Sequence, residues 1–306
     1  MRNILKGLIT IMVTAREDSG EVSKLKIKKH IKFLKDNGMT KENGAIVVTG
    51  SIGECAALTV EERVKVWEAS LESAKGEVPI IAGINETNPD EVIEMSRLAK
   101  IAGADLVMIM SPYYWKPSVR SVRDFYLKII KNVYLPIFLY NNISATQIDL
   151  PLDLLSELAE CDKVVGLKEC TPNFIKFERV YNRLHNKISI INGNGEFWEP
   201  YAGLLGCEGF VSGIANFAPK KSIDILHARN KGDYKEVYKI KAELEPYFEY
   251  FNKITSRYGM SVEPDILKTA TSIIVSDVGP CKPPITLLTQ DEKEELKKAL
   301  KESNLI

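Results

Sequence analysis

Short apolar segments alternate with amphipathic segments along most of this chain, and that alternation constrains the fold more than any other feature. The predicted strands cover residues 8–13, 45–49, 79–83, 106–110, 136–140, 164–168, 188–192 and 209–212. The segments with helical periodicity cover residues 24–37, 59–74, 89–102, 119–131, 151–159, 173–184, 198–205 and 219–231. Eight strand–helix units predict a (β/α)8 TIM barrel, because a doubly wound sheet usually contains fewer strands.

The pattern changes after residue 231, where only helical segments follow. These cover residues 234–254, 264–274 and 291–303. We therefore expect two parts, a barrel over residues 1–231 and a helical C-terminal extension over residues 232–306 that packs on it. Two of the predicted barrel helices have recognisable starts: Thr59 and Glu62 have the spacing of a capping box, and Asn88 precedes a first-turn proline.

Composition and charge exclude several classes of function. Lysines plus arginines and aspartates plus glutamates both number 41, so nothing predicts nucleic-acid or membrane binding. Three distant histidines make a histidine metal site unexpected. The five cysteines form no C-x-x-C pair and are expected to be free thiols. Lys6 interrupts the first apolar stretch, which predicts a strand rather than a signal peptide and a cytoplasmic protein.

The sixth predicted strand ends in Lys168. Burial destabilises a charged amine, so we expect desolvation to lower the pKa of Lys168 and to leave a neutral, nucleophilic nitrogen. Such a nitrogen forms a Schiff base with a carbonyl. A single lysine at a strand end is more commonly solvated or paired with a neighbour, here Glu169, so only its surroundings in the fold decide between these interpretations.

Other chemically useful residues end neighbouring strands. Barrel enzymes place their active sites at the carboxyl ends of the strands, and adjacent strands lie about 4.8 Å apart. Tyr140 ends the fifth strand, so we expect it near Lys168, where a phenol can donate and accept protons. The second strand runs into the turn 50–54, whose Ser51 and backbone N–H groups suit a carboxylate. We assign Glu54 to structure, accepting hydrogen bonds near the start of the next helix.

The same residues form an ordered set of motifs along essentially the whole chain. In chain order the motifs are Gly50-Ser51-Ile52-Gly53-Glu54, Leu58-Thr59-x-x-Glu62-Arg63, Pro112-Tyr113-Tyr114, Leu139-Tyr140-Asn141, Gly166-Leu167-Lys168-Glu169 and Val278-Gly279-Pro280-x-x-Pro283-Pro284. The combination resembles the dihydrodipicolinate synthase / N-acetylneuraminate lyase family of class I, pyruvate-type aldolases and dehydratases.

The resemblance implies roles for the barrel residues. Lys168 would form the imine with pyruvate or another 2-oxo acid, and Tyr140 would be the general acid and base. In the turn that begins at Gly50, Ser51 and the amide of Ile52 would bind the substrate carboxylate and relay protons. No metal or organic cofactor is implied, and the second substrate would be an aldehyde.

The resemblance also implies an assembly. The family is usually a homotetramer built from two tight dimers, and Tyr114 would reach into the site of a neighbouring subunit. Val211 matches an aliphatic position near the substrate.

Two departures from the family pattern bear on the substrate. Ile52 stands where the family usually has a second threonine, so one hydroxyl is lost. Ala145 stands where synthases of the lysine pathway have an arginine that grips the carboxylate of the aldehyde. We therefore favour an aldolase or lyase acting on 2-keto-3-deoxy sugar acids.

Three alternatives stay open. The first is a dehydratase that acts on a 2-keto-3-deoxy sugar acid through the same lysine imine. The second is a dihydrodipicolinate (4-hydroxy-tetrahydrodipicolinate) synthase. The third is a non-catalytic protein that binds a 2-oxo acid, which the missing hydroxyl at Ile52 favours and the presence of Lys168, Tyr140 and Ser51 opposes.

Overall fold

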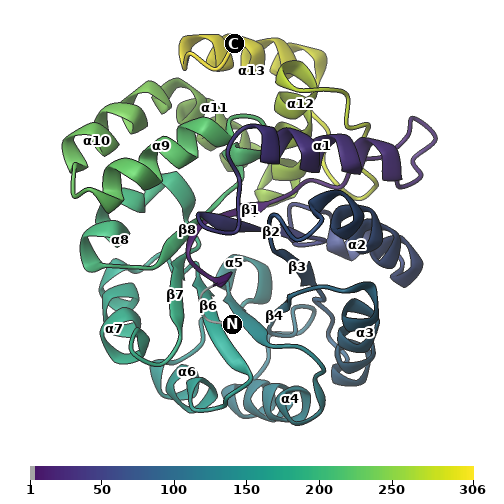
Figure 1. The fold of residues 1–306 in the computed structure, drawn as a ribbon, viewed down its shortest axis with the longest axis vertical. Coiled ribbons are helices and arrows are strands. Elements are labelled where there is room, and N and C mark those ends of the chain that lie inside the picture. Colours follow the sequence, from purple (N-terminus) through teal and green to yellow (C-terminus); the bar gives the residue numbers. More distant parts are fainter. Residues whose placement is uncertain (1–3) are drawn as a thin grey trace.

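Eight parallel strands close into a barrel in the computed structural model, which describes residues 4–306 (Figure 1). The strands are β1 (Gly7–Ile11), β2 (Gly44–Val48), β3 (Ile80–Gly83), β4 (Leu106–Met110), β5 (Ile137–Asn141), β6 (Val164–Glu169), β7 (Ser189–Asn192) and β8 (Gly209–Ser212). They follow chain order around the barrel, and β8 closes it by pairing with β1, where Gly209 lies opposite Gly7. The predicted TIM barrel is confirmed, with strand ends shifted by no more than about two residues.

Helices surround the strands on the outside of the barrel, as Figure 1 shows. The helices are α1 (Lys24–Asp36), α2 (Val60–Ala74), α3 (Pro89–Ala102), α4 (Val119–Asn132), α6 (Leu152–Ala159), α7 (Phe174–Leu184), α8 (Glu199–Leu205) and α9 (Pro219–Asn230), with a short α5 (Ile143–Thr146) after β5. The capping box of α2 is present, because the Thr59 hydroxyl accepts from the Glu62 amide and the Glu62 carboxylate accepts from the Thr59 amide. Within residues 4–306 no helix is long and apolar enough to cross a bilayer.

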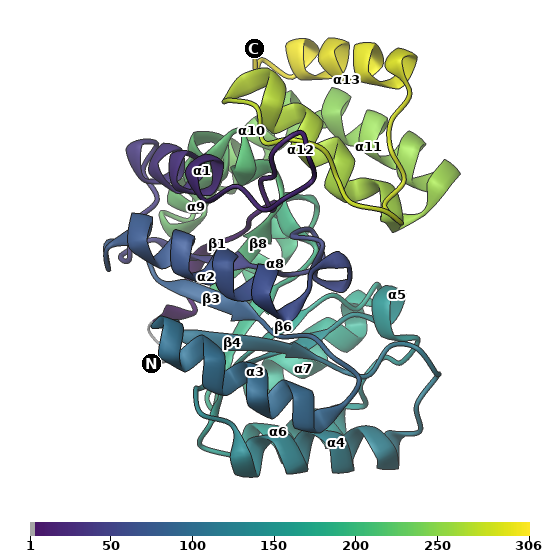
Figure 2. The same cartoon turned by 90° about the vertical axis from the view of Figure 1, so that its right-hand side faces the viewer.

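Four helices complete the chain after α9. They are α10 (Tyr234–Glu243), α11 (Glu245–Tyr258), α12 (Glu263–Ile274) and α13 (Gln290–Glu302). The expectation of one helix over residues 234–254 is wrong, since the chain breaks at Leu244. Pro246 explains the break: a proline lacks the amide hydrogen and clashes within a continuous helix, but it is tolerated in the first turn of α11. Figure 2 shows α11 on the same side of the barrel as α5, opposite the N-terminal end.

The barrel interior explains the glycine in the lysine motif. Every residue of β6 except Val165 is buried. A Cβ at Gly166 would lie 2.3 Å from Cδ1 of Leu5, which is itself fully buried. A larger residue at this position would therefore displace the buried side chain of Leu5.

A buried ion pair joins the β2 turn to the C-terminal helices. The Glu54 carboxylate lies 2.7 Å from Nζ of Lys268 on α12, and both side chains are almost inaccessible to solvent. The same carboxylate accepts a hydrogen bond from the Lys282 amide at 2.7 Å. Glu54 is thus structural, but the expectation that it serves the start of the next helix is wrong. Its closest partners, Lys268 and the Lys282 amide, belong to the C-terminal extension, and Arg16 lies 3.9 Å away; sequence proximity could not indicate any of them.

We predict that Glu54→Gln will destabilise the protein strongly. The substitution leaves the Lys268 ammonium buried without its counter-charge, and breaking such a pair typically costs about 3–5 kcal/mol. Urea unfolding will measure the change. The matched control is Glu295→Gln, which breaks the exposed pair with Lys253 and is expected to cost less than about 1 kcal/mol. A loss for Glu54→Gln as small as that of the control would contradict the prediction.

Candidate active site

Lys168 and Tyr140 meet inside the carboxyl end of the barrel. The pairing of β5 with β6 places the two residues directly opposite each other. Nζ of Lys168 lies 4.1 Å from the centre of the Tyr140 ring, and the two residues are only 6% and 3% exposed. The expectation that adjacent strand ends bring the two side chains together therefore agrees with the structure.

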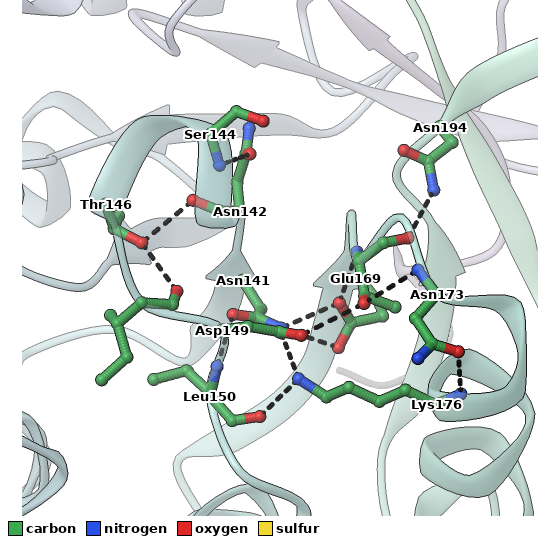
Figure 3. Close-up of polar contacts among 12 residues, drawn as sticks. Asn141, Asn142, Ser144, Thr146, Asp149, Leu150, Glu169, Asn173, Lys176 and Asn194 are labelled. Atoms are coloured by element: carbon green, nitrogen blue, oxygen red, sulfur yellow. Dashed lines mark hydrogen bonds and ion pairs between the residues drawn. The ribbon is translucent and has the colours of Figure 1, made fainter.

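The next residue on each strand faces the other way and locks the two strands together (Figure 3). Nδ2 of Asn141 donates to both carboxylate oxygens of Glu169, at 2.8 and 3.0 Å, and to Asp149 at 2.9 Å. Asp149 is also paired with Lys176. Burial raises the pKa of Glu169 to about 7, while the bonds from Asn141 oppose the rise. The carboxylate of Glu169 is therefore hydrogen-bonded to Asn141. The alternative in which Glu169 forms an ion pair with Lys168 does not agree with the structure.

A cavity of about 420 Å³ lies over Lys168 and Tyr140. Three other predicted residues, Ser51, Ile52 and Val211, line it. Gly50 does not belong to the lining. Left-handed backbone occurs at Thr49, just before this turn, and at Glu54, its last residue.

Tyr114 lies outside the cavity of its own chain. It sits in the loop between β4 and α4, where its side chain is 72% exposed and packs edge-on against Trp115 at 5.0 Å between ring centres. An exposed aromatic pair is typical of a surface that contacts a partner. The role of Tyr114 in a neighbouring subunit's site stays a prediction.

The pKa of Lys168 departs from expectation. Burial acts to lower the pKa, as the sequence argument assumed, but Tyr140, Cys170 and Glu263 all act in the opposite direction. The net result is a raised pKa, so the expected lowering is wrong. The reason is that the lysine is buried among weak acids rather than in a purely apolar pocket.

Tyr140 is held by polar neighbours that sequence reasoning missed in part. Nδ2 of Asn142 donates to the Tyr140 hydroxyl at 2.8 Å. Burial raises the pKa of Tyr140, whereas Lys168 and the hydrogen bonds from Asn142 and Ser51 lower it. A phenol so placed keeps its proton in the resting site while its oxygen stays oriented. Asn142 could have been found from the sequence, because it follows the Leu139-Tyr140-Asn141 motif directly.

The loops after β7 and β8 supply part of the rim. Gly193, Asn194 and Gly195 line the cavity. Glu196 also borders it, but its carboxylate accepts from the hydroxyls of Ser212 and Ser222 at 2.5 and 2.6 Å. These bonds are buried, so Glu196 serves chiefly to fix the loop.

The C-terminal extension supplies six further residues of the lining. The residues from this part of the chain are Tyr247, Phe251, Asn252, Met260, Glu263 and Leu267. Sequence reasoning missed all six, because the rule that strand ends carry the chemistry says nothing about helices that pack over a barrel mouth. Among the described residues that line the cavity, Lys168 is the single cationic side chain.

The cysteines and acidic residues suggest no metal centre. Within residues 4–306 no three histidine, cysteine, aspartate or glutamate side chains gather closely enough to hold an ion. The five cysteines are free thiols, as expected. Burial raises the pKa of Cys170, which lines the cavity, to about 12, so this thiol is not an activated nucleophile.

Comparisons with known proteins agree with this geometry. The sequence profile of the Dihydrodipicolinate synthetase family matches residues 4–303. The 4-hydroxy-tetrahydrodipicolinate synthase of Methanocaldococcus jannaschii is 30% identical over 305 residues, which cover 99% of this chain and 100% of the relative. The enzyme of the same name from Methanosphaera stadtmanae is 29% identical over 307 residues, with 99% of each chain covered.

Solved structures give the same result. Dihydrodipicolinate synthase from Aquifex aeolicus superposes with a TM-score of 0.89 at 28% identity, covering 98% of this chain and 99% of that one. YagE from Escherichia coli K12, a prophage protein solved in complex with pyruvate, superposes with a TM-score of 0.88 at 26% identity, covering 99% and 100%. This chain therefore belongs to the dihydrodipicolinate synthase family of Schiff-base-forming class I aldolases, which are lyases.

Proposed function

We propose that the protein is a pyruvate-type lyase that cleaves 2-keto-3-deoxy sugar acids, or the reverse aldolase, through an imine on Lys168. The observation that carries the proposal is the amine of Lys168, which lies 4.1 Å from the centre of the Tyr140 ring in the wall of the cavity. A buried amine beside a buried phenol has both the nucleophile and the proton donor that imine formation needs.

The chemistry follows from this arrangement. The neutral amine of Lys168 attacks the 2-oxo carbon, and the carbinolamine loses water as Tyr140 supplies a proton to the departing oxygen. The C3–C4 bond then breaks: its electrons pass into the protonated imine, and the proton of the C4 hydroxyl leaves to a base. The resulting enamine takes up a proton at C3, and hydrolysis of the imine releases pyruvate and regenerates the amine.

The charge of the cavity supports a substrate with one carboxylate. Ser51 and Ile52 line the cavity, and the hydroxyl of Ser51 with the amide of Ile52 would bind the carboxylate next to the 2-oxo group. Lys168 is the single cation of the lining within residues 4–306, and it is consumed by the imine. Ala145 offers no second cation for another carboxylate. The neutral polar groups of Asn142, Ser144, Asn194 and Asn252 suit sugar hydroxyls.

A second candidate is 4-hydroxy-tetrahydrodipicolinate synthase. The names of the relatives at 29–30% identity favour it, since they align over nearly the whole chain. The missing arginine at Ala145 opposes it, because no described residue of the cavity replaces that guanidinium. A dehydratase on the same sugar acids uses the same imine and differs only in which bond breaks.

We expect the purified protein to trap pyruvate covalently. Borohydride added in the presence of pyruvate will reduce the imine, and intact mass with peptide mapping will place the adduct on Lys168. Lys168→Ala will abolish it, whereas Lys187→Ala, which removes a surface lysine, will not change it. A folded wild-type protein without an adduct, even from a 2-keto-3-deoxy acid, would leave only the binding-protein alternative.

We expect 2-keto-3-deoxygluconate to yield free pyruvate and glyceraldehyde in equal amounts. Loss of water without pyruvate would identify the dehydratase instead, because then only the C–O bond breaks. Condensation of pyruvate with aspartate semialdehyde as the preferred reaction would identify the synthase. Chromatography with mass detection distinguishes the three products in one assay.

We expect Tyr114→Phe to lower kcat by about 10²-fold, because the lost hydroxyl would remove a proton relay. The assembly proposed here is a homotetramer of two tight dimers, in which Tyr114 acts on the partner's site. Tyr134→Phe, another exposed tyrosine, is the control. Unchanged turnover in a variant that keeps the wild-type mass in solution would count against the relay.

A further inference from the structure

We propose that Glu263 selects the aldehyde half of the substrate: it accepts hydrogen bonds from hydroxyl groups of uncharged hydroxyaldehydes and repels aldehydes that carry a carboxylate. The inference rests on the proposed lyase function, because it concerns the same cavity and the partner of pyruvate in the same reaction.

The position of Glu263 is the first observation. It begins α12, in the C-terminal extension, and lines the cavity that contains Lys168. Its charge acts on Lys168, and the charge of Lys168 acts on it in return. A substrate group bound in this cavity therefore experiences the field of a carboxylate, which is only weakly screened by water there.

The second observation is that Glu263 has no partner. Within residues 4–306 no side chain or backbone group forms a hydrogen bond or an ion pair with its carboxylate, although the residue is partly buried. Carboxylates in structural roles nearby are all bonded: Glu54 pairs with Lys268, and Glu199 pairs with Arg229 at 2.6 Å. An unpartnered carboxylate at a cavity wall has its acceptor sites available for a ligand.

Helix stabilisation alone does not account for Glu263. An acidic residue at a helix start is favoured by the helix dipole. The chain provides a direct comparison in α11, which begins with Glu245 followed by Pro246, as α12 begins with Glu263 followed by Pro264. Glu245 is exposed and does not belong to the cavity lining. The dipole explains both glutamates, but only Glu263 meets the substrate site.

Repulsion is the specific part of the proposal. Discrimination against a wrong substrate is often achieved by an unfavourable charge rather than by a better fit to the right one. A second carboxylate on the aldehyde would face Glu263 without a compensating cation, since Ala145 occupies the position of the expected arginine. A sugar hydroxyl would instead donate to the carboxylate, which is a charge-assisted bond.

The repulsion must depend on pH. Burial raises the pKa of Glu263 to about 7, and Lys168 opposes the rise. The other titratable groups that face it are Cys170, at the end of β6, and Tyr247, on α11, and the pKa of each is raised by burial and by Glu263. Both stay neutral near pH 7, so Glu263 is the group whose charge changes there. Discrimination against anions is therefore full above about pH 8 and is lost as the pH falls through about 7.

A competition assay tests the proposal. Pyruvate is offered an equimolar mixture of glyceraldehyde and tartronate semialdehyde, in which a carboxylate replaces the terminal CH2OH of glyceraldehyde. The ratio of the two aldol products, measured by mass spectrometry at early times, equals the ratio of the two kcat/KM values, and imine formation with pyruvate cancels from it. We expect Glu263→Gln to lower the neutral-to-anionic ratio at least tenfold, while Glu263→Asp and Glu245→Gln keep the wild-type ratio.

The outcomes separate the possible failures. A Glu263→Gln variant that makes both products at an unchanged ratio overturns the inference, as does a parallel fall in both rates, which would mean a role in a shared step. The wild-type ratio must also fall when the pH is lowered from about 8 to about 6, which tests the inference even if the variant does not fold. A wild-type protein that forms neither the pyruvate adduct nor any aldol product overturns the proposed function, and the inference with it.

Discussion

The buried pair of Glu54 and Lys268 determines how the two halves of the active site meet. Glu54 follows Ser51 and Ile52 in the β2 turn, and Lys268 lies about one and a half turns after Glu263 on α12. Their contact of 2.7 Å fixes α12 against the turn. The pair is tolerable in a dry interior because each partner has a further contact: the Lys282 amide donates to Glu54, and Lys268 donates to the Pro280 carbonyl at 2.7 Å.

The raised pKa of Lys168 is informative about the imine. A site that only needed a neutral amine would be apolar and would lower the pKa. This site instead raises the pKa of Lys168, and Glu263, which is charged above about pH 7, stabilises positive charge on Nζ, whereas Tyr140 and Cys170 do so only when they lose their protons. Under the proposed function the protonated imine carries that same charge, so the surroundings favour the electron-deficient species that drives bond cleavage. Because the pKa of Lys168 is raised, its ammonium must lose a proton before the amine can attack the substrate. The raised pKa of Tyr140 means that the phenol keeps its own proton before that attack.

The sequence predicted the barrel and the meeting of Lys168 with Tyr140 well because both depend on the local strand pattern. Lys168 and Tyr140 end neighbouring strands of the predicted barrel. Once the barrel closes, their side chains can hardly lie anywhere but close together. The C-terminal helices were less predictable, since the partners of Glu54 and the break at Leu244 follow from packing between distant segments. The pKa of Lys168 was mispredicted for the same reason, because one of the three acids that raise it, Glu263, belongs to α12.

The barrel strands and the C-terminal extension contribute different parts of the active site, and this affects how far membership of the family predicts the substrate. The barrel strands supply Lys168, Tyr140 and the Ser51 turn, which are the motifs that place the chain among class I aldolases. The C-terminal extension contributes Glu263 to the wall of the same cavity, and Ala145 lies in α5, next to Ser144, which also lines the cavity. The relatives near 30% identity align over nearly the whole chain, extension included. Under the proposed function, the barrel motifs specify the reaction type, and a few charges on elements that the strand pattern does not specify would decide the aldehyde.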